Sequence, residues 1–391
     1  MSSPGPQSYG PHGYGPQSYP AAPMWPQPKP RSSLTLLLEI IGIALGLAGA
    51  LYLVAYVASA TGVGATAVSS ILALFPLAGV IGAVLWVDRW EPEPKWLLAA
   101  AFAWGAGVST AVSLWLNTAY SQSVYNRTGD DVLANTLGAV VGAPLVEESI
   151  KCLGVLLIFL LRRKFFDGPV DGIVYAAVVA AGFAFTENIL YFAQNSAAGA
   201  LGMTFVMRGI MSPFAHLIFT AAAGIALGFA SRSRNSLTWV WAFPIGLVGA
   251  MLLHAVWNAS ASLGGVMLVA YFLFQVPLFA AVIVLVVWLR NDEKATIGNR
   301  LSEYAQAGWF APHEIQMLTS LKGRRLARSW AGARGARAKE AMKTFQKQAT
   351  ALAYTRQRAL TGRYDFGVQR DEQELLATVN QARAGFMGAP A

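Results

Sequence analysis

Long apolar runs separated by short polar connectors fill the chain from Leu34 to Arg290. A helix that crosses a bilayer needs about 20 largely apolar residues. Because backbone polar groups in lipid must be satisfied within the spanning segment, runs of this kind form α-helices. The pattern predicts an all-α polytopic membrane protein with about eight transmembrane helices, near residues 33–60, 66–87, 96–120, 136–161, 168–192, 203–230, 237–262 and 265–290.

Basic residues in the connectors predict the orientation of these helices, because Lys and Arg are enriched in short cytoplasmic loops. They occur before the first span and after spans two, four and six, whereas the opposite connectors contain only Arg127. The pattern predicts an even number of spans, with the N- and C-termini both cytoplasmic. The residues on that side are Lys29, Arg31, Arg89, Lys95, Arg162, Arg163, Lys164, Arg232 and Arg234.

Two tails flank this predicted membrane domain of residues 33–290. Residues 1–32 are rich in Pro, Gly and Tyr, contain the pentapeptide GPQSY twice and lack a signal-peptide pattern, so we expect a disordered tail. Residues 291–391 contain 16 Lys and Arg against 9 Asp and Glu, which predicts a basic cytoplasmic helical tail. We expect its densest cluster to contact anionic membrane lipid, or else to form a solvated helix face, and we expect no nucleic acid partner. The cluster is Lys322, Arg324, Arg325 and Arg328.

The composition is that of a membrane protein, and its single cysteine excludes some kinds of site. Hydrophobic residues make up 55% of the 391 residues and charged residues 13%, which is too apolar for a soluble protein of this length. The single cysteine, Cys152, excludes an intrachain disulfide and a Cys-rich zinc cluster. We therefore do not expect redox chemistry.

A small set of ionisable and amide side chains interrupts four of the predicted spans. A charge at the centre of a bilayer costs at least about 2.5 kcal/mol, so such residues are candidates for function. At about 1.5 Å per residue, all of them lie between the midplane and the outer leaflet, where they could share one water-filled pocket. They are Glu147, Glu148 and Lys151 in the fourth span, Glu187 and Asn188 in the fifth, His216 in the sixth, and His254 and Asn258 in the seventh.

These residue types suit peptide hydrolysis, which needs a base to activate water, donors for the oxyanion and an acid for the leaving amine. Structural interpretations also exist: Glu147 and Lys151, one turn apart, could simply neutralise each other, and buried histidines often join helices. We expect Arg208 to snorkel or to bind a loop rather than to take part in catalysis. The whole set favours an enzyme over a proton-coupled transporter with a Glu and His relay, or a non-catalytic scaffold.

Four ordered motifs on successive spans resemble those of the PrsW family, which is related to the CAAX prenyl endopeptidases. The resemblance covers about residues 70–290 and includes the DRWEPEP stretch of residues 88–94. It implies an eight-helix intramembrane endopeptidase of glutamate type, sometimes described as a metalloprotease. The motifs are EE-xx-K at Glu147 to Lys151, F-xxx-EN at Glu187 and Asn188, H-xx-FT at His216 to Thr220, and H-xx-WN at His254 to Asn258.

The resemblance also implies roles for these residues in cleaving a membrane-anchored protein at a bacterial plasma membrane. The prenyl endopeptidases prefer an Arg one residue after the position of Lys151, and this departure argues against a prenylated substrate. In this interpretation the water-activating base is Glu147 with Glu148 and His216, the oxyanion donors are His254 and Asn258, and the supporting residues are Lys151, Glu187 and Asn188.

We expect no cofactor, with a zinc-dependent version of the same protease as the alternative. Imidazole and carboxylate are ordinary zinc ligands at open catalytic sites, so the ligands would be Glu147, His216 and His254. The chain contains no HExxH motif.

Overall fold

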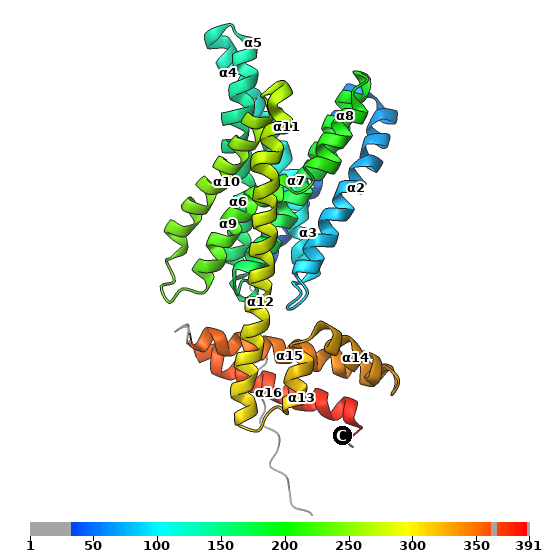
Figure 1. Ribbon diagram of the computed structural model, residues 1–391, viewed down its shortest axis with the longest axis vertical. Helices are drawn as coiled ribbons and strands as arrows, with labels where there is room; N and C mark the ends of the chain where they lie inside the picture. The colour runs from blue at the N-terminus through cyan, green and yellow to red at the C-terminus, as the bar shows by residue number, and fades with distance from the viewer. Residues whose placement is uncertain (1–32, 361–365, 389–391) are drawn as a thin grey trace, which may run out of the picture.

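The computed structural model describes residues 33–360 and 366–388, so the tail predicted at residues 1–32 lies outside the described residues. The described residues form helices and no strands. A bundle of upright helices stands on a second group of helices, of which α14, α15 and α16 lie across the end of α12 (Figure 1). By length and composition, seven described helical segments could cross a membrane, as expected for a multi-pass membrane protein: Ile40–Thr61, Val63–Val87, Lys95–Thr128, Pro169–Ser196, Leu201–Ser231, Trp239–Ala261 and Gly264–Gln306.

The predicted span at residues 136–161 is helical but is not among these seven. It consists of α5 (Asp131–Leu137), the π-helical turn η2 (Gly138–Gly142) and α6 (Ala143–Leu161). Its charged residues Glu147, Glu148 and Lys151 reduce its hydropathy, yet α6 packs against α7, α9 and α10 inside the bundle. That this fourth predicted segment crosses the membrane, as an eighth span beside the seven, stays a prediction.

Most of the other predicted spans correspond to one or more consecutive helices. The first two are α1 (Ser33–Thr61) and α2 (Val63–Val87), and the third extends past its predicted end at residue 120 because η1 and α4 continue α3. The sixth is interrupted at Ser212–Phe214, where Pro213 separates η4 from α9. The remaining elements are α3 (Lys95–Ala103), η1 (Trp104–Ser109), α4 (Thr110–Thr128), η3 (Arg163–Phe165), α7 (Pro169–Ala197), α8 (Leu201–Phe205), η4 (Val206–Met211), α9 (Ala215–Ser231), α10 (Trp239–Ala261), η5 (Gly264–Val266), α11 (Met267–Ala270), η6 (Tyr271–Gln275) and α12 (Val276–Gln306).

Helix α7 is the centre of the bundle and is buried along most of its length. Glycines let its neighbours approach closely: a Cβ added to Gly172 would lie 2.0 Å from the carbonyl oxygen of Gly224 in α9. Small residues at such crossings allow backbones to pack together in a membrane. The close α7–α9 crossing fixes Glu187 of α7 relative to His216 of α9.

Helix α12 passes the predicted end of the last span at residue 290 and joins the C-terminal helical group. This group consists of the end of α12 with α13 (Pro312–Leu318), α14 (Leu321–Gly332), α15 (Ala336–Leu360) and α16 (Phe366–Met387). Its core contains the fully buried Ile297, Leu301 and Phe345. The group has its own hydrophobic core, which explains why α12 stays helical past residue 290.

One residue of the predicted lipid-binding cluster has a structural role instead. Arg324 is 6% exposed, and its guanidinium donates to the carbonyl oxygens of Leu318 (2.7 Å) and Trp90 (3.0 Å). It therefore joins the C-terminal helical group to the α2–α3 connector. Lys322 and Arg325 are exposed, and lipid contact through them stays a prediction.

Burial raises the pKa of three carboxyl groups in the α2–α3 connector. Burial raises the pKa of Asp88 to about 7, although the backbone N–H of Glu93 donates to its carboxylate at 3.1 Å and opposes this rise. Burial, together with the charge of Asp171, raises the pKa of Glu93 well above its usual range. The hydroxyl of Tyr175 donates to Glu93. Burial likewise raises the pKa of Glu91.

Candidate active site

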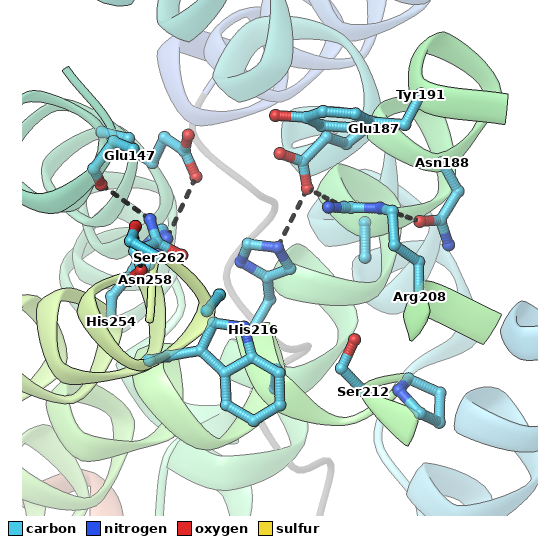
Figure 2. A pocket seen from close by; sticks show the side chains of 17 residues that line it. Glu147, Glu187, Asn188, Tyr191, Arg208, Ser212, His216, His254, Asn258 and Ser262 are labelled. Atoms are coloured by element: carbon cyan, nitrogen blue, oxygen red, sulfur yellow. Dashed lines mark hydrogen bonds and ion pairs between the residues drawn. The ribbon is translucent and has the colours of Figure 1, made fainter. Parts of the chain in front are cut away.

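A cavity of about 240 Å³ lies among α6, α7, η4, α9 and α10. In Figure 2, Glu147 and His254 lie on one side of this cavity and Glu187 and Arg208 on the other, with His216 between them. Glu148 and Lys151 lie behind the wall and are fully buried. The structure thus brings the predicted residues together, and those that line the cavity are Glu147, Glu187, Asn188, His216, His254 and Asn258.

Glu148 is the centre of a buried polar layer behind the cavity. Its Oε1 atom lies 2.5 Å from Nζ of Lys151 and 2.9 Å from Nδ1 of His254, and its Oε2 accepts the hydroxyl of Thr220 at 2.9 Å. An ionised carboxylate only accepts hydrogen bonds, so Nδ1 of His254 is the donor in this pair. The other ring nitrogen of His254, Nε2, is therefore the one directed away from Glu148.

Of the two carboxylate oxygens of Glu147, one accepts a hydrogen bond and the other does not. Its Oε1 atom accepts the amide of Asn117 at 3.1 Å. Its Oε2 atom is buried and has no hydrogen-bond partner among the described residues. This atom lies 3.8 Å from Nζ of Lys151 and 4.0 Å from Nε2 of His254. Since buried carboxylate oxygens normally have partners, Oε2 is the atom that is available to a water molecule or a substrate.

His216 is held from two sides. Its Nε2 atom lies 2.9 Å from Oε2 of Glu187, and its Nδ1 atom lies 3.3 Å from Nζ of Lys151. An ammonium group has no acceptor, so Nδ1 accepts from Lys151 and Nε2 donates to Glu187. Both contacts are satisfied by a neutral imidazole with its proton on Nε2.

Arg208 does not snorkel away from the bundle, in contrast to the expectation from the sequence. Its NH2 atom lies 2.5 Å from Oε2 of Glu187, and its Nε donates to Oδ1 of Asn188 at 2.9 Å. The guanidinium also lies over the ring of Tyr191, 4.2 Å from its centroid. Arg208 belongs to the π-helical turn η4, and its side chain lines the cavity.

Asn258 lines the cavity but also has a structural contact. Its amide nitrogen donates at 2.7 Å to the carbonyl oxygen of Ala139, which belongs to η2. In a π-helical turn the carbonyl of one residue pairs with the N–H five residues later, and for Ala139 that residue is Pro144, which has no N–H. The carbonyl of Ala139 is therefore available to Asn258. Asn117, which donates to Oε1 of Glu147, was not among the residues predicted from the sequence.

The residues can be tested for their fit to zinc. Glu147, His216 and His254 each offer one ligand atom, and these atoms lie within 4.8 Å of one another. The carboxylates of Glu148 and Glu187, each 2.9 Å from a histidine, match the groups that orient metal-bound imidazoles. The set therefore fits zinc by residue type.

Two distances fit zinc less well. The 4.0 Å between Oε2 of Glu147 and Nε2 of His254 exceeds the roughly 3.4 Å that separates ligands in a tetrahedral site with bonds of about 2.1 Å. The ammonium of Lys151 lies 3.3 Å from Nδ1 of His216 and already supplies a cation between the carboxylates. Zinc binding would require both of these contacts to change.

The fold and the site together define the class of protein. It is a multi-pass membrane protein that encloses an acid–base centre of carboxylates and histidines among its helices. Residues 93–282, which include every predicted site residue, match the model of a family described as "PrsW family intramembrane metalloprotease".

Individual relatives agree with this match. The chain is 30% identical over 197 residues to "Protease PrsW" of Clostridioides difficile (strain 630), covering 48% of this chain and 76% of the relative. It is 32% identical over 155 residues to "Protease PrsW" of Geobacillus kaustophilus (strain HTA426), covering 39% of this chain and 63% of the relative. No solved structure matches the chain significantly. The chain belongs to the PrsW family and is an intramembrane protease of a bacterial membrane.

Proposed function

We propose that this protease cleaves a membrane-anchored protein by metal-independent glutamate chemistry, with Glu147 as the base. The observation that carries the proposal is that Oε2 of Glu147, a residue that lines the cavity, has no hydrogen-bond partner among the described residues. Ligand atoms of Glu147, His216 and His254 lie within 4.8 Å of one another. A water oxygen placed between three atoms this close would lie within about 2.8 Å of each, an ordinary hydrogen-bond distance.

In the proposed reaction, Glu147 removes a proton from this water as the water oxygen attacks the scissile carbonyl carbon. His216, oriented by Glu187, would hold the water through Nδ1 once Nζ of Lys151, which lies 3.3 Å from that atom, moves away from it. The oxyanion accepts hydrogen bonds from His254 and from the amide of Asn258. The oxyanion then collapses to a carbonyl group and the C–N bond breaks, while Glu147 transfers the proton to the leaving amine nitrogen, so the base of the first step is the acid of the second.

His254 can donate to the oxyanion only when both of its nitrogens are protonated, because Nδ1 already faces Glu148. The carboxylate of Glu148, 2.9 Å from Nδ1, would balance the charge of this imidazolium. Lys151 balances the remaining negative charge of the two glutamates. The buried polar layer thus supports a positive donor at His254 without being in contact with the substrate.

A zinc-dependent protease is the second candidate, favoured by the proximity of the three ligand atoms and by the description of the family. Glu147, His216 and His254 would hold the ion, while Glu148 and Glu187 would orient the two imidazoles. Zinc bound there supplies a Lewis acid that polarises a carbonyl group and makes a bound water more acidic.

The test compares protein fragments in membranes of cells that express the wild-type chain or Glu147→Gln, each with and without a zinc chelator. Glu340→Gln is the matched control, because it makes the same change at a residue with no predicted role in cleavage. The Glu340 side chain lies on α15 and is 68% exposed. Fragments lost in Glu147→Gln but insensitive to chelator support the proposal. Fragments also lost with chelator favour zinc, and identical fragments in all samples contradict a protease and favour transport or scaffolding.

A further inference from the structure

Four polar residues follow one another on η1 and α4 at a spacing of four positions. They are Ser109, Ser113, Asn117 and Ser121, and we refer to them as the α4 polar stripe. Residues four apart lie on the same face of a helix, with their Cβ atoms about 5–6 Å from each other. Polar groups on a helix inside a membrane need partners from the protein or from water, because lipid offers none.

The α4 polar stripe faces η2 and α6 and reaches Glu147. A Cβ added to Gly138 of η2 would lie 2.2 Å from Oγ of Ser121. Further along α4, the amide nitrogen of Asn117 donates to Oε1 of Glu147 in α6 at 3.1 Å. No residue of η1 or α4 lines the active-site cavity, so the stripe and the cavity reach Glu147 by different routes.

Three members of the stripe have a buried polar atom without a hydrogen-bond partner among the described residues. These atoms are Oγ of Ser109, Oγ of Ser113 and Oδ1 of Asn117. Ser109 is 0% exposed and Ser113 is 3% exposed. A helical hydroxyl group can bond to the carbonyl four residues earlier, as Thr118 and Thr128 of the same helix do at 2.7 and 2.9 Å. Because buried polar atoms normally have partners, the three atoms of the stripe point to bound water.

The stripe begins at the polar end of α4. Ser121 is half-buried, and the helix continues for another two turns with the exposed residues Gln122, Asn126 and Arg127. This part of α4 and α5 form the end of the molecule farthest from the C-terminal helical group (Figure 1). The stripe therefore runs from an exposed polar segment past Glu147 to the buried Ser109.

We infer that the α4 polar stripe holds a row of water molecules beside Glu147 and replaces the water that Glu147 activates while substrate occupies the cavity. The inference rests on the proposed function. Each cleaved peptide bond consumes one water molecule, and a substrate in the cavity would block that route to Glu147. Two hydrogen bonds of about 2.8 Å together span the separation between successive stripe residues, so one water molecule can join each pair. Oδ1 and Nδ2 of Asn117 belong to one amide group, so a water held at Oδ1 lies next to Glu147.

The first test measures whether water reaches Ser113, and it does not depend on cleavage. In a Cys152→Ser background, which removes the single native thiol, Ser113→Cys is compared with Ala111→Cys. Ala111 is the matched control, because two residues turn a helix by about 200° and place it on the opposite face at a similar depth. The full-length protein in proteoliposomes is treated with silver ions, and the thiols that remain are counted with a maleimide dye after unfolding.

We expect silver to block the thiol at position 113 about tenfold faster than the thiol at position 111, because an ion enters a membrane protein only along water or polar groups. Equal rates at the two positions, or a thiol at position 113 that silver does not reach, overturn the water-holding stripe.

The second test asks whether this water is used in cleavage. Ser113→Val and Ser113→Thr introduce side chains of the same shape, of which only Thr keeps the hydroxyl group. We expect Ser113→Val to lower kcat about tenfold with KM unchanged, as for the loss of one hydrogen bond, and Ser113→Thr to restore kcat. A packing defect would affect both variants alike, so equal kcat values in the two variants overturn the supply of water by the stripe. If wild type and Glu147→Gln give the same fragments, the proposed function fails, and the reaction with silver still decides whether the stripe holds water.

Discussion

Lys151 offers the most detailed test of the buried polar layer, because it is a fully buried cation. Its Nζ atom lies 2.5 Å from Glu148 and 3.8 Å from Glu147. With an effective dielectric constant of about 20, these contacts correspond to gross attractions of about 7 and about 4 kcal/mol. Desolvation offsets most of this sum, and removal of one partner of a buried ion pair typically costs about 3–5 kcal/mol.

We therefore expect Lys151→Met to lower the unfolding free energy by about 3–5 kcal/mol, since Glu148 keeps its charge and loses its cation. The double variant Lys151→Met, Glu148→Gln removes both charges and should be less destabilised than the sum of the single variants. The measurement is thermal unfolding of purified protein in detergent micelles at one scan rate, with about 2–4 °C expected per kcal/mol. A melting temperature unchanged in Lys151→Met, or additive effects in the double variant, would refute the assignment of a buried ion pair.

Three further predictions address other parts of the structure. Arg208→Lys keeps the charge but cannot contact Glu187 and Asn188 together, so we expect cleavage to fall about tenfold while the melting temperature changes little. Gly107→Ala should lower the melting temperature, because the added Cβ would lie 1.7 Å from the carbonyl oxygen of Gly46, whereas Gly79→Ala, with nothing within 4 Å, should not. The melting temperature should fall as the pH rises from about 5 to about 8, because Asp88 binds its proton up to about pH 7 when folded but only to about pH 4 when unfolded. Asp88→Asn keeps an acceptor for the backbone N–H of Glu93 and should reduce this fall. If the melting temperatures of Asp88→Asn and wild type depend on pH in the same way, the pKa of Asp88 is not raised.

The helical membrane fold could be predicted from the sequence because each span requires a continuous run of about 20 apolar residues, and such a run is a local property of the chain. It could not predict where helices deviate from regularity. The π-helical turns η2 and η4 leave no mark in the pattern of apolar residues, yet they contain Ala139, which accepts from Asn258, and Arg208, which lines the cavity. The continuation of α12 to Gln306 depends on the core of the C-terminal helical group, which involves residues far apart in the chain.

The candidate site was found from the sequence because charged residues are rare within spans. Glu147, Glu148, His216 and His254 could be named on that basis, but their pairing could not. The crossings of α6, α7, α9 and α10 decide this pairing. They bring Glu148 to His254 and Glu187 to His216. Asn117 was missed because a single amide in an apolar span gives no signal of its own.

The most direct test of the central claim is the cleavage rate of purified enzyme in proteoliposomes, measured together with its metal content. The substrate is a membrane protein whose fragments distinguish wild type from Glu147→Gln in cells. We predict full activity in protein stripped of metal and a loss of about 10²–10⁴-fold in Glu147→Gln. Activity that rises and falls with bound zinc, or a Glu147→Gln variant that cleaves at the wild-type rate, would contradict this prediction.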